Sequence, residues 1–488
     1  MSRAIVPLLL FLVAAGLVFA KLGHVHLANF DDCYYAEKAK EMIRDGDWVT
    51  PHFAGVPRTD NPPLFLWLMA LAFLAAGIRE GPAIFWSALS GALCIPALYL
   101  LARRLRAPPF EAWVAAVVLL GTQYFLKYSR HAMFDVFLTF LFLLGIFGYV
   151  RAAQGDRRWF LLLGASVGLG ILTKSVLGAF PLAVVVIHTV GTGRAGLFKD
   201  RWFLAALVLA ACIAVPWYAA QMHLHREQFL EEHVRWLLLR RGIGAGRPWW
   251  SVFDYARELA MIYWPWLPLA AAGGWFALRR AVGPAAEDAP SGAWSARDTA
   301  RLLFAWLAVV LIPLSLASEK KLWYVMSAFP CLALLSSIAA GTWIRSESKR
   351  WAIVAYGFAL LAVVAVAAWA LPIPLGKARR PELQAVALAA RDAVPGNQVV
   401  ANLDLPYWSV VNQFLFYSDH AITEPLGDPS AVRAKLQAGE FALLTPSGWM
   451  RVAGADSAAY EIAASAGDWY LVRAGHEASH PGAPTTAR

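Results

Sequence analysis

Acidic side chains that could act in proton transfer occur at two places in the chain. Asp31 and Asp32 open a polar stretch behind the first apolar run, and Asp135 stands at the head of a later apolar run. An ionised carboxylate can orient or deprotonate an attacking hydroxyl group, and an ionisable side chain at membrane depth is costly unless it has a function. The alternative role is structural, because an acid is favoured at the N-terminus of a helix. All three are therefore candidate catalytic residues and candidate helix caps.

Basic side chains that could hold an anion occur in four separate segments. A leaving phosphate group gains negative charge as its bond breaks, and nearby cations stabilise that charge. The alternative for the paired lysines is an anchoring role, in which long side chains reach the membrane interface. The candidate cations are Arg58, Arg130, Lys174, Lys320 and Lys321.

The composition indicates a protein that crosses a membrane many times. Of the 488 residues, 59% are hydrophobic and 16% are charged, and the mean hydropathy is +0.51. A soluble chain of this length needs more polar surface. The net charge is +10, but the basic residues cluster between apolar runs, which is typical of cytoplasmic loops and not of a nucleic-acid surface. We expect an all-α polytopic membrane protein in contact with membrane lipids, with no nucleic-acid partner.

The lengths of the apolar runs and the positions of Lys and Arg predict about eleven to thirteen spans. Residues 5–20 are assigned to an uncleaved first span. Residues 62–78 are assigned to a helix in the interface, because a span there would place the basic cluster at 103–106 outside. Eleven spans leave the C-terminus outside. The basic pairs that then fall outside are at 240–241, 320–321 and 379–380.

The chain is expected to form two domains. Residues 1–375 form a transmembrane domain whose first outer loop covers about 22–82, and residues 376–488 form a small extracytoplasmic α/β domain with a disordered tail from residue 476. In this second domain the patterns predict helices at 382–393 and 431–437, and strands at 398–401, 441–444, 460–463 and 469–472.

The first outer loop begins with the pattern of an amphipathic helix. Tyr35, Ala39, Met42 and Ile43 recur at helical spacing, and Gly46 is the expected stop. A turn-rich passage then leads to the step Thr59-Asp60-Asn61-Pro62-Pro63.

Three ordered motifs in this loop carry a family resemblance. They are Phe30-Asp31-Asp32-Cys33-Tyr34-Tyr35-Ala36, then Gly46-Asp47-Trp48-Val49-Thr50-Pro51, then Asn61-Pro62-Pro63-Leu64. The pattern resembles the first extracytoplasmic loop of the GT-C type membrane glycosyltransferases. These enzymes take a sugar from a polyprenyl-phosphate carrier, and they include the dolichyl-phosphate-mannose protein mannosyltransferases and the bacterial aminoarabinose lipid A transferases.

The resemblance implies a hexosyl- or pentosyltransferase in a bacterial inner membrane. Its active site and C-terminus would face the periplasm or the outside. Its donor would be a polyprenyl-phosphate-linked sugar, transferred with inversion to lipid A, an envelope glycan or a protein. No nucleotide sugar is implied.

The resemblance also implies roles for individual residues. Asp31 matches the catalytic acid of the first loop, and Asp32 stands where the family usually has Glu. Asp135 matches an acid of the second loop. The Lys320-Lys321 pair with Tyr324 resembles a family K-x-x-Y step, and Lys174 in Leu172-Thr173-Lys174-Ser175 resembles a T-K-G step. The residues expected to contact substrate are Tyr35, Asp60, Asn61, His131 and Tyr324.

Two departures from the lipid A transferases bear on the substrates. Those enzymes have Lys where this chain has Asn61, and Arg where it has Tyr34. Arg58 is a candidate replacement cation. The departures leave open the aminoarabinose donor and the lipid A acceptor, but not the general chemistry.

A divalent metal is the only cofactor considered. The long outer loop contains Glu231-Glu232-His233, and some family members hold a metal near such a pair. Asp60, Glu232 and His233 are therefore candidate ligands. The alternative is a plain exposed histidine.

Two other classes of function compete with the enzyme. A transporter or flippase of a lipid-linked sugar would also need many spans, but transporters tend to show internal repeats and broken midplane helices, and we find no repeat in this chain. A structural subunit of an envelope complex would need no acid pair.

Overall fold

The computed structural model describes residues 5–24, 27, 31–243, 248–282, 294–370, 380–405, 407–454 and 456–475. Contacts divide the chain into two compact units. The membrane unit contains residues 1–22, 46–51 and 57–375, and the C-terminal unit contains residues 23–45, 52–56 and 376–488. Phe30, Arg379 and the expected disordered tail lie outside the described residues.

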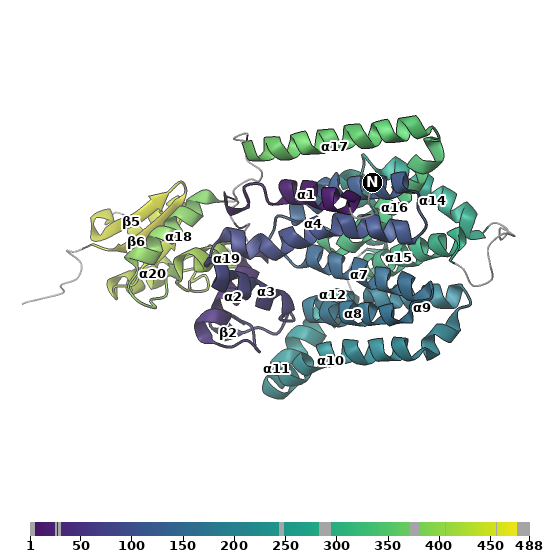
Figure 1. Cartoon of the computed structure of the whole chain (residues 1–488). Coiled ribbons are helices and arrows are strands. Elements are labelled where there is room, and N and C mark those ends of the chain that lie inside the picture. Colours follow the sequence, from purple (N-terminus) through teal and green to yellow (C-terminus); the bar gives the residue numbers. More distant parts are fainter. Residues whose placement is uncertain are drawn as a thin grey trace, which may run out of the picture. The chain divides into compact units, whose positions relative to one another are not determined.

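Helices make up the membrane unit (Figure 1). Among the described residues, seven helical segments are long and apolar enough to cross a membrane, so the multi-span class is confirmed, while the number of spans stays a prediction. The two apolar runs assigned from the sequence, residues 5–20 and 62–78, contain helices α1 and α3. The main helices are α1 (Ile5–Val18), α3 (Leu64–Ala76), α4 (Glu80–Arg104), α5 (Pro109–Leu120), α7 (Asp135–Ala153), α8 (Phe160–Lys174), α9 (Phe180–Gly191), α10 (Arg201–Leu224), α14 (Leu267–Val282), α15 (Ala296–Leu316), α16 (Phe329–Trp343) and α17 (Glu347–Ala370).

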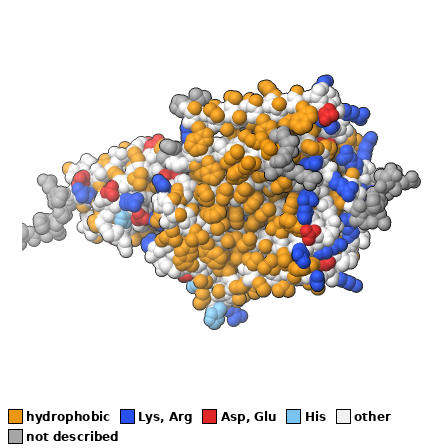
Figure 2. Space-filling view, in the orientation of Figure 1, with side chains coloured by type: hydrophobic (Ala, Val, Ile, Leu, Met, Phe, Trp, Pro, Cys, Tyr) orange, Lys and Arg blue, Asp and Glu red, His pale blue; other side chains and the backbone are white. Residues whose placement is uncertain are grey.

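The surface of these helices has the character expected for contact with lipid. On the face shown in Figure 2, hydrophobic side chains cover the helices, and Lys and Arg side chains gather at one end. The last turns of α4, α7 and α14 carry such basic residues. This arrangement agrees with the clustering of basic residues between apolar runs.

Short helices connect the spans and carry most of the polar residues. They are α6 (Gln123–Tyr128), η3 (Ser175–Ala179), α11 (Arg226–Phe229), the π-helix η5 (Leu230–Arg240), α12 (Arg241–Ile243), η6 (Trp249–Phe253), α13 (Asp254–Ile262) and η7 (Leu322–Ala328). Helices α8 and α10 approach closely through small residues. A Cβ atom on Gly168 would lie 2.9 Å from the carbonyl oxygen of Ala210.

The C-terminal unit contains a four-stranded sheet with the order β3-β4-β6-β5. Strand β3 (Ala401–Asn402) pairs in parallel with β4 (Ala442–Leu444), and β6 (Trp469–Ala474) runs antiparallel to β4 and β5 (Tyr460–Ala466). The helices are α18 (Pro381–Ala393), α19 (Tyr407–Ser418), α20 (Pro429–Gln437) and α21 (Pro446–Ala453). The predicted small α/β unit is therefore confirmed, and α19 and α21 were not predicted.

The first-loop helix α2 (Asp31–Asp45) groups with the C-terminal unit by its contacts, whereas the sequence analysis placed it with residues 1–375. It starts at Asp31 and ends just before Gly46, whose φ is +71°, as predicted. Tyr35, Ala39 and Met42 are buried as the period predicts.

The amphipathic pattern of α2 predicts that its polar face is exposed to solvent, and this prediction was wrong. Glu37, Lys38, Lys40 and Glu41 are buried as well. The physical reason is partner groups on other segments of the same unit. Lys40 Nζ lies 2.6 Å from an oxygen of Asp419, and Glu41 accepts hydrogen bonds from two backbone N–H groups of the turn between β1 (His52–Phe53) and β2 (Val56–Pro57).

Candidate active site

Asp135 and Lys174 form a buried ion pair in the membrane unit. Asp135 is the first residue of α7 and is 3% exposed, and Lys174 is the last residue of α8. The ammonium group of Lys174 donates a hydrogen bond to Oδ1 of Asp135, while Oδ2 accepts none from the described residues. Lys174 Nζ also lies 4.3 Å from the ring centroid of Tyr324 and 4.8 Å from that of Phe134. Three predicted site residues from three segments therefore meet here.

Arg130 is buried near the start of the same helix α7. Its Nη1 donates a hydrogen bond of 2.6 Å to the carbonyl oxygen of Val18 and a longer one to that of Leu17, at the C-terminal end of α1. Its Nε and Nη2 groups are buried and make no hydrogen bond within the described residues. Because an unsatisfied guanidinium is costly to bury, these N–H groups are suited to an anion.

The step from Arg58 to Asn61 is held by Glu232. The Glu232 carboxylate accepts hydrogen bonds from Thr59 N at 2.7 Å, from Thr59 Oγ1 at 3.1 Å and from Arg58 Nη1 at 3.1 Å. Arg58 is therefore in an ion pair here. Asp60 and Asn61 follow directly on this fixed backbone.

His233 is buried, so the interpretation as a plain exposed histidine was wrong. Its exposed fraction is 2%. Nδ1 lies 3.0 Å from the carbonyl oxygen of Thr59, and Nε2 lies 2.5 Å from Oγ of Ser175. Burial lowers the pKa of His233, against a smaller opposing effect of its hydrogen bond to Thr59, so the ring is neutral.

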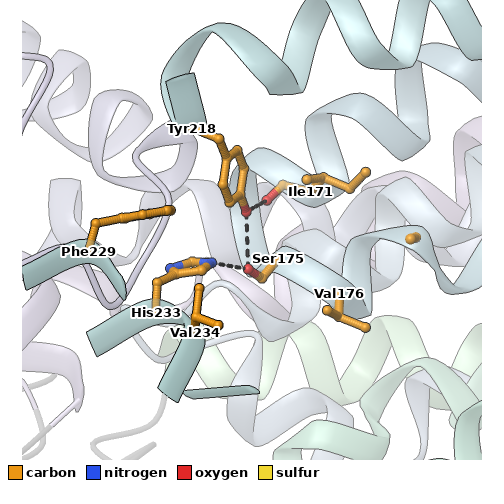
Figure 3. Close-up of a pocket in the computed structure, with 8 residues that line it drawn as sticks. Ile171, Ser175, Val176, Tyr218, Phe229, His233 and Val234 are labelled. Atoms are coloured by element: carbon orange, nitrogen blue, oxygen red, sulfur yellow. Dashed lines mark hydrogen bonds between the residues drawn. The ribbon is translucent and has the colours of Figure 1, made fainter. Parts of the chain in front are cut away.

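A pocket of about 360 Å³ opens beside this histidine (Figure 3). Its walls are mostly apolar, and Ser175, Tyr218 and His233 point toward one another at its polar end. Tyr218 OH lies 3.0 Å from Ser175 Oγ. The sequence analysis named neither Ser175 nor Tyr218 as a site residue. The sequence did carry a signal for Ser175, because a serine stands there in place of the glycine of the T-K-G step. The structure shows that Ser175 has a φ of +50°, a region that favours glycine.

The metal interpretation does not fit the residues present. The structure shows no group of three or more His, Cys, Asp or Glu side chains, within its described ranges, that could hold a metal ion. Both ring nitrogens of His233 and both oxygens of Glu232 are already engaged in hydrogen bonds. We derive no chemistry from a metal at this place.

The Lys320-Lys321 pair lies in an organised loop. Lys320 Nζ is 3.2 Å from Ser251 Oγ, and Lys321 Nζ is 3.4 Å from Oε1 of Glu319. Arg241 also binds Glu319, with 2.7 Å between Nη2 and Oε1. The Arg241 guanidinium lowers the pKa of Glu319. The pair leads directly into η7, which carries Tyr324 to Lys174.

His131 belongs to an aromatic group in the membrane unit. Its ring stacks on Tyr128 with 5.2 Å between centroids, and Tyr128 lies 5.8 Å from Trp323. Trp323 precedes Tyr324 in η7. The predicted substrate-contacting residues His131 and Tyr324 are thus linked through neighbouring aromatic rings.

Asp31 and Asp32 occupy the first turn of α2 in the C-terminal unit. This is where the free N–H groups and the dipole of the helix favour negative charge. Asp32 is 3% exposed, and Tyr35 is 7% exposed one turn later. The position fits both the capping and the catalytic interpretation.

Comparisons with known proteins support the family resemblance. A profile of the family described as dolichyl-phosphate-mannose-protein mannosyltransferase matches residues 60–219. The chain is 30% identical over 381 residues to the undecaprenyl phosphate-alpha-4-amino-4-deoxy-L-arabinose arabinosyl transferase of Pseudomonas aeruginosa (strain PAO1), which covers 73% of this chain. The chain spans less than two thirds of the length of the curated relatives it matches: 64% of this transferase, and 61% of an uncharacterized protein of Aquifex aeolicus that is 25% identical.

Solved structures show the same fold. The crystal structure of ArnT from Cupriavidus metallidurans bound to undecaprenyl phosphate is similar with a TM-score of 0.77 at 18% identity, over 99% of this chain and 100% of that chain. An archaeal oligosaccharyltransferase from Archaeoglobus fulgidus is similar with a TM-score of 0.53 at 12% identity, over 90% of this chain and 69% of that chain. The resemblance predicted from the loop motifs is therefore confirmed, and the chain is similar in sequence to the aminoarabinose transferases and has the fold of the GT-C type membrane glycosyltransferases.

Proposed function

We propose that this protein is a membrane glycosyltransferase that moves a monosaccharide from a polyprenyl-phosphate carrier to an extracytoplasmic acceptor, with inversion. The observation that carries the proposal is the buried Asp135–Lys174 pair beneath Tyr324, which leaves one carboxylate oxygen without a hydrogen bond from the described residues. Buried ion pairs of this kind often mark functional sites.

In this reaction an acceptor oxygen forms a bond to the anomeric carbon while the bond from that carbon to the phosphate oxygen breaks. The acceptor proton passes to a carboxylate, for which Asp31 is the candidate, with Asp32 beside it and Asp135 assisting. The leaving lipid phosphate gains negative charge. Lys174, Arg130 and the Lys320-Lys321 pair are the candidate groups that stabilise this charge.

The substrates are proposed as classes. The Pseudomonas relative is named for an undecaprenyl-phosphate-linked aminoarabinose, and the solved ArnT structure is described as bound to undecaprenyl phosphate. These names support a polyprenyl-phosphate donor for this chain. Asn61 and Tyr34 depart from the lipid A transferases, so the acceptor class includes lipid A, an envelope glycan or a protein. Nothing in the comparisons favours the transporter alternative.

We further propose a bacterial inner membrane with the active site and the C-terminus on the periplasmic or outer side. The basic ends of α4, α7 and α14 support this orientation, since such clusters stay in the cytoplasm. A reporter fused to the C-terminus should be active outside. Activity of the reporter in the cytoplasm would mean that the assignment of α3 to the interface is wrong.

Turnover of a purified polyprenyl-phosphate sugar in nanodiscs, followed by mass spectrometry, tests the function. Asp31→Asn should reduce turnover by about a hundredfold or more, because the amide keeps much of the capping capacity but cannot accept the proton. Asp45→Asn is the matched control, since Asp45 is an exposed acid at the other end of α2 and pairs with Arg44. Wild-type turnover in Asp31→Asn would return Asp31 to a capping role.

A further inference from the structure

Glu232 and His233 lie next to each other in the π-helix η5, a helix type that is frequent at functional sites. Both oxygens of Glu232 are fully used. Oε2 accepts from Thr59 N and Thr59 Oγ1, and Oε1 accepts from Arg58 Nη1 and from Gln228 Nε2 at 3.2 Å. Three of these four hydrogen bonds come from Arg58 and Thr59, so the carboxylate fixes the chain at these two residues.

The hydrogen bonds of His233 fix its tautomer. A carbonyl oxygen can only accept, so Nδ1 carries the proton and donates to Thr59 O. In the neutral ring Nε2 then accepts, and the donor is the hydroxyl group of Ser175. Tyr218 OH is consequently a donor toward Ser175 Oγ, or toward Ile171 O at 3.3 Å (Figure 3). The order of donors and acceptors is therefore fixed from Ser175 through His233 to Thr59.

The two segments that these side chains join both carry predicted site residues. Thr59 is followed by Asp60 and Asn61, and Ser175 is preceded by Lys174, the partner of Asp135. Ser175 has a φ of +50°, which is unfavourable for a residue with a Cβ atom and persists only when its surroundings hold it. The bond to His233 is one of the contacts that hold this turn.

We propose that Glu232 and His233 form a positioning clamp that keeps Lys174 and the Asp60-Asn61 step in register for the lipid-linked donor. The inference rests on the proposed function and assigns to this acid–histidine pair a hydrogen-bonding role in place of metal binding. A displacement of about 1 Å in a positioned group can cost about a hundredfold in rate. Loss of either end of the clamp therefore affects transfer, although neither residue touches the reacting atoms.

Two substitutions, one of His233 and one of Ser175, break the hydrogen bond between these two side chains from opposite sides. His233→Asn can still donate to Thr59 O from the amide nitrogen, but it is too short to accept from Ser175. Ser175→Ala breaks the same bond from the other side. We expect each variant to lower kcat/KM for the donor at least tenfold, with the KM for the acceptor unchanged. The kcat/KM of the double variant for the donor should lie within about threefold of that of either single variant, because all three variants lose the same hydrogen bond between His233 and Ser175.

Glu232 and His233 each have a matched control variant. Glu231→Gln changes an exposed acid that pairs with Arg235, and His223→Asn changes an exposed histidine of α10. Both variants should retain wild-type kinetics, whereas Glu232→Gln should lower kcat/KM for the donor at least tenfold. Neutral behaviour of Ser175→Ala together with a loss in His233→Asn would overturn the clamp, since a metal ligand does not need the serine. Additive losses in the double variant would also overturn it.

Hydrogen–deuterium exchange of the full-length protein tests the clamp without any substrate. In His233→Asn and in Ser175→Ala, exchange should increase together at residues 57–61 and 173–177, and in Glu231→Gln it should not change. If the wild type transfers no sugar but these exchange changes occur, the proposed function fails and the clamp stands. If exchange at the two segments is unaffected, the clamp is wrong. Ser175→Ala is the smaller change, because it removes a single oxygen atom. If His233→Asn does not fold, the exchange experiment is done with Ser175→Ala alone.

Discussion

Glu37 provides a prediction that links pH to stability. Its side chain is fully buried in α2, and one oxygen lies 2.9 Å from Lys40 Nζ. Lys40 Nζ also lies 2.6 Å from a carboxylate oxygen of Asp419 and donates a hydrogen bond of 3.0 Å to the carbonyl oxygen of Phe416. The second oxygen of Glu37 has no hydrogen bond within the described residues. Burial raises the pKa of Glu37 from 4.5 to about 7, although Lys40 opposes the rise.

The sign follows from this direction. A group with a raised pKa in the folded state binds its proton more tightly there than in the unfolded chain. Its contribution to stability is therefore complete below about pH 4.5 and is lost as the pH rises through 7. The shift from 4.5 to about 7 corresponds to about 3 kcal/mol at most, at 1.36 kcal/mol per pKa unit. For a unit of this size such a change amounts to several degrees of melting temperature.

The variant Glu37→Gln isolates this effect. Its amide oxygen can still accept from Lys40 but does not titrate, so the variant should match the wild type near pH 5 and melt several degrees higher at pH 8. The assay is thermal unfolding of the purified full-length protein in detergent from pH 5 to 8. Glu424→Gln, at an exposed glutamate of the same unit, is the control and should follow the wild type. If the difference in melting temperature between Glu37→Gln and wild type stays constant from pH 5 to 8, the reasoning is refuted.

Two further predictions concern the membrane unit. Lys320→Gln combined with Lys321→Gln should keep expression but lower donor turnover about a hundredfold, near 3 kcal/mol of transition-state stabilisation; turnover within about threefold of wild type would make these lysines interface anchors. Gly148→Ala should destabilise the fold by about 1–3 kcal/mol, because its Cβ would lie 2.8 Å from the carbonyl oxygen of Trp159. In Gly191→Ala the added Cβ would have no neighbour within 4 Å among the described residues, so this variant should melt like wild type. Equal melting of both variants would contradict the packing argument.

The apolar period of α2 was readable from the sequence, but the burial of its charged residues was not. Periodicity reports only which residues share a face. The groups that satisfy Lys40, the carbonyl oxygens of Leu415 and Phe416, lie more than 370 residues later in the chain. No local pattern indicates such partners, so a buried Glu37–Lys40 pair looks like an ordinary exposed pair in the sequence.

The two helices missed in the C-terminal unit have different causes. Helix α19 is rich in aromatic and branched residues, which are weak helix formers and favour strands, so tertiary contacts override its local preference. Helix α21 does carry a readable signal. Thr445 is its N-cap, with an Oγ1 that accepts from Gly448 N, and Pro446 is its first residue.

The candidate phosphate-binding cations can be ranked by the charges that already neutralise them within the protein. Arg241 and Lys321 share the carboxylate of Glu319, so part of their positive charge is already neutralised without a ligand. Lys321 is also 41% exposed on its side chain, and a charge in contact with water stabilises a leaving group less than a charge in a dry site does. Lys174 is largely shielded and pairs with the carboxylate of Asp135. One oxygen of that carboxylate and two N–H groups of Arg130 have no hydrogen-bond partner among the described residues. A dry site with unmet hydrogen bonds gains more from a bound phosphate, so we rank Lys174 and Arg130 ahead of the Lys320-Lys321 pair as candidate ligands of the leaving group.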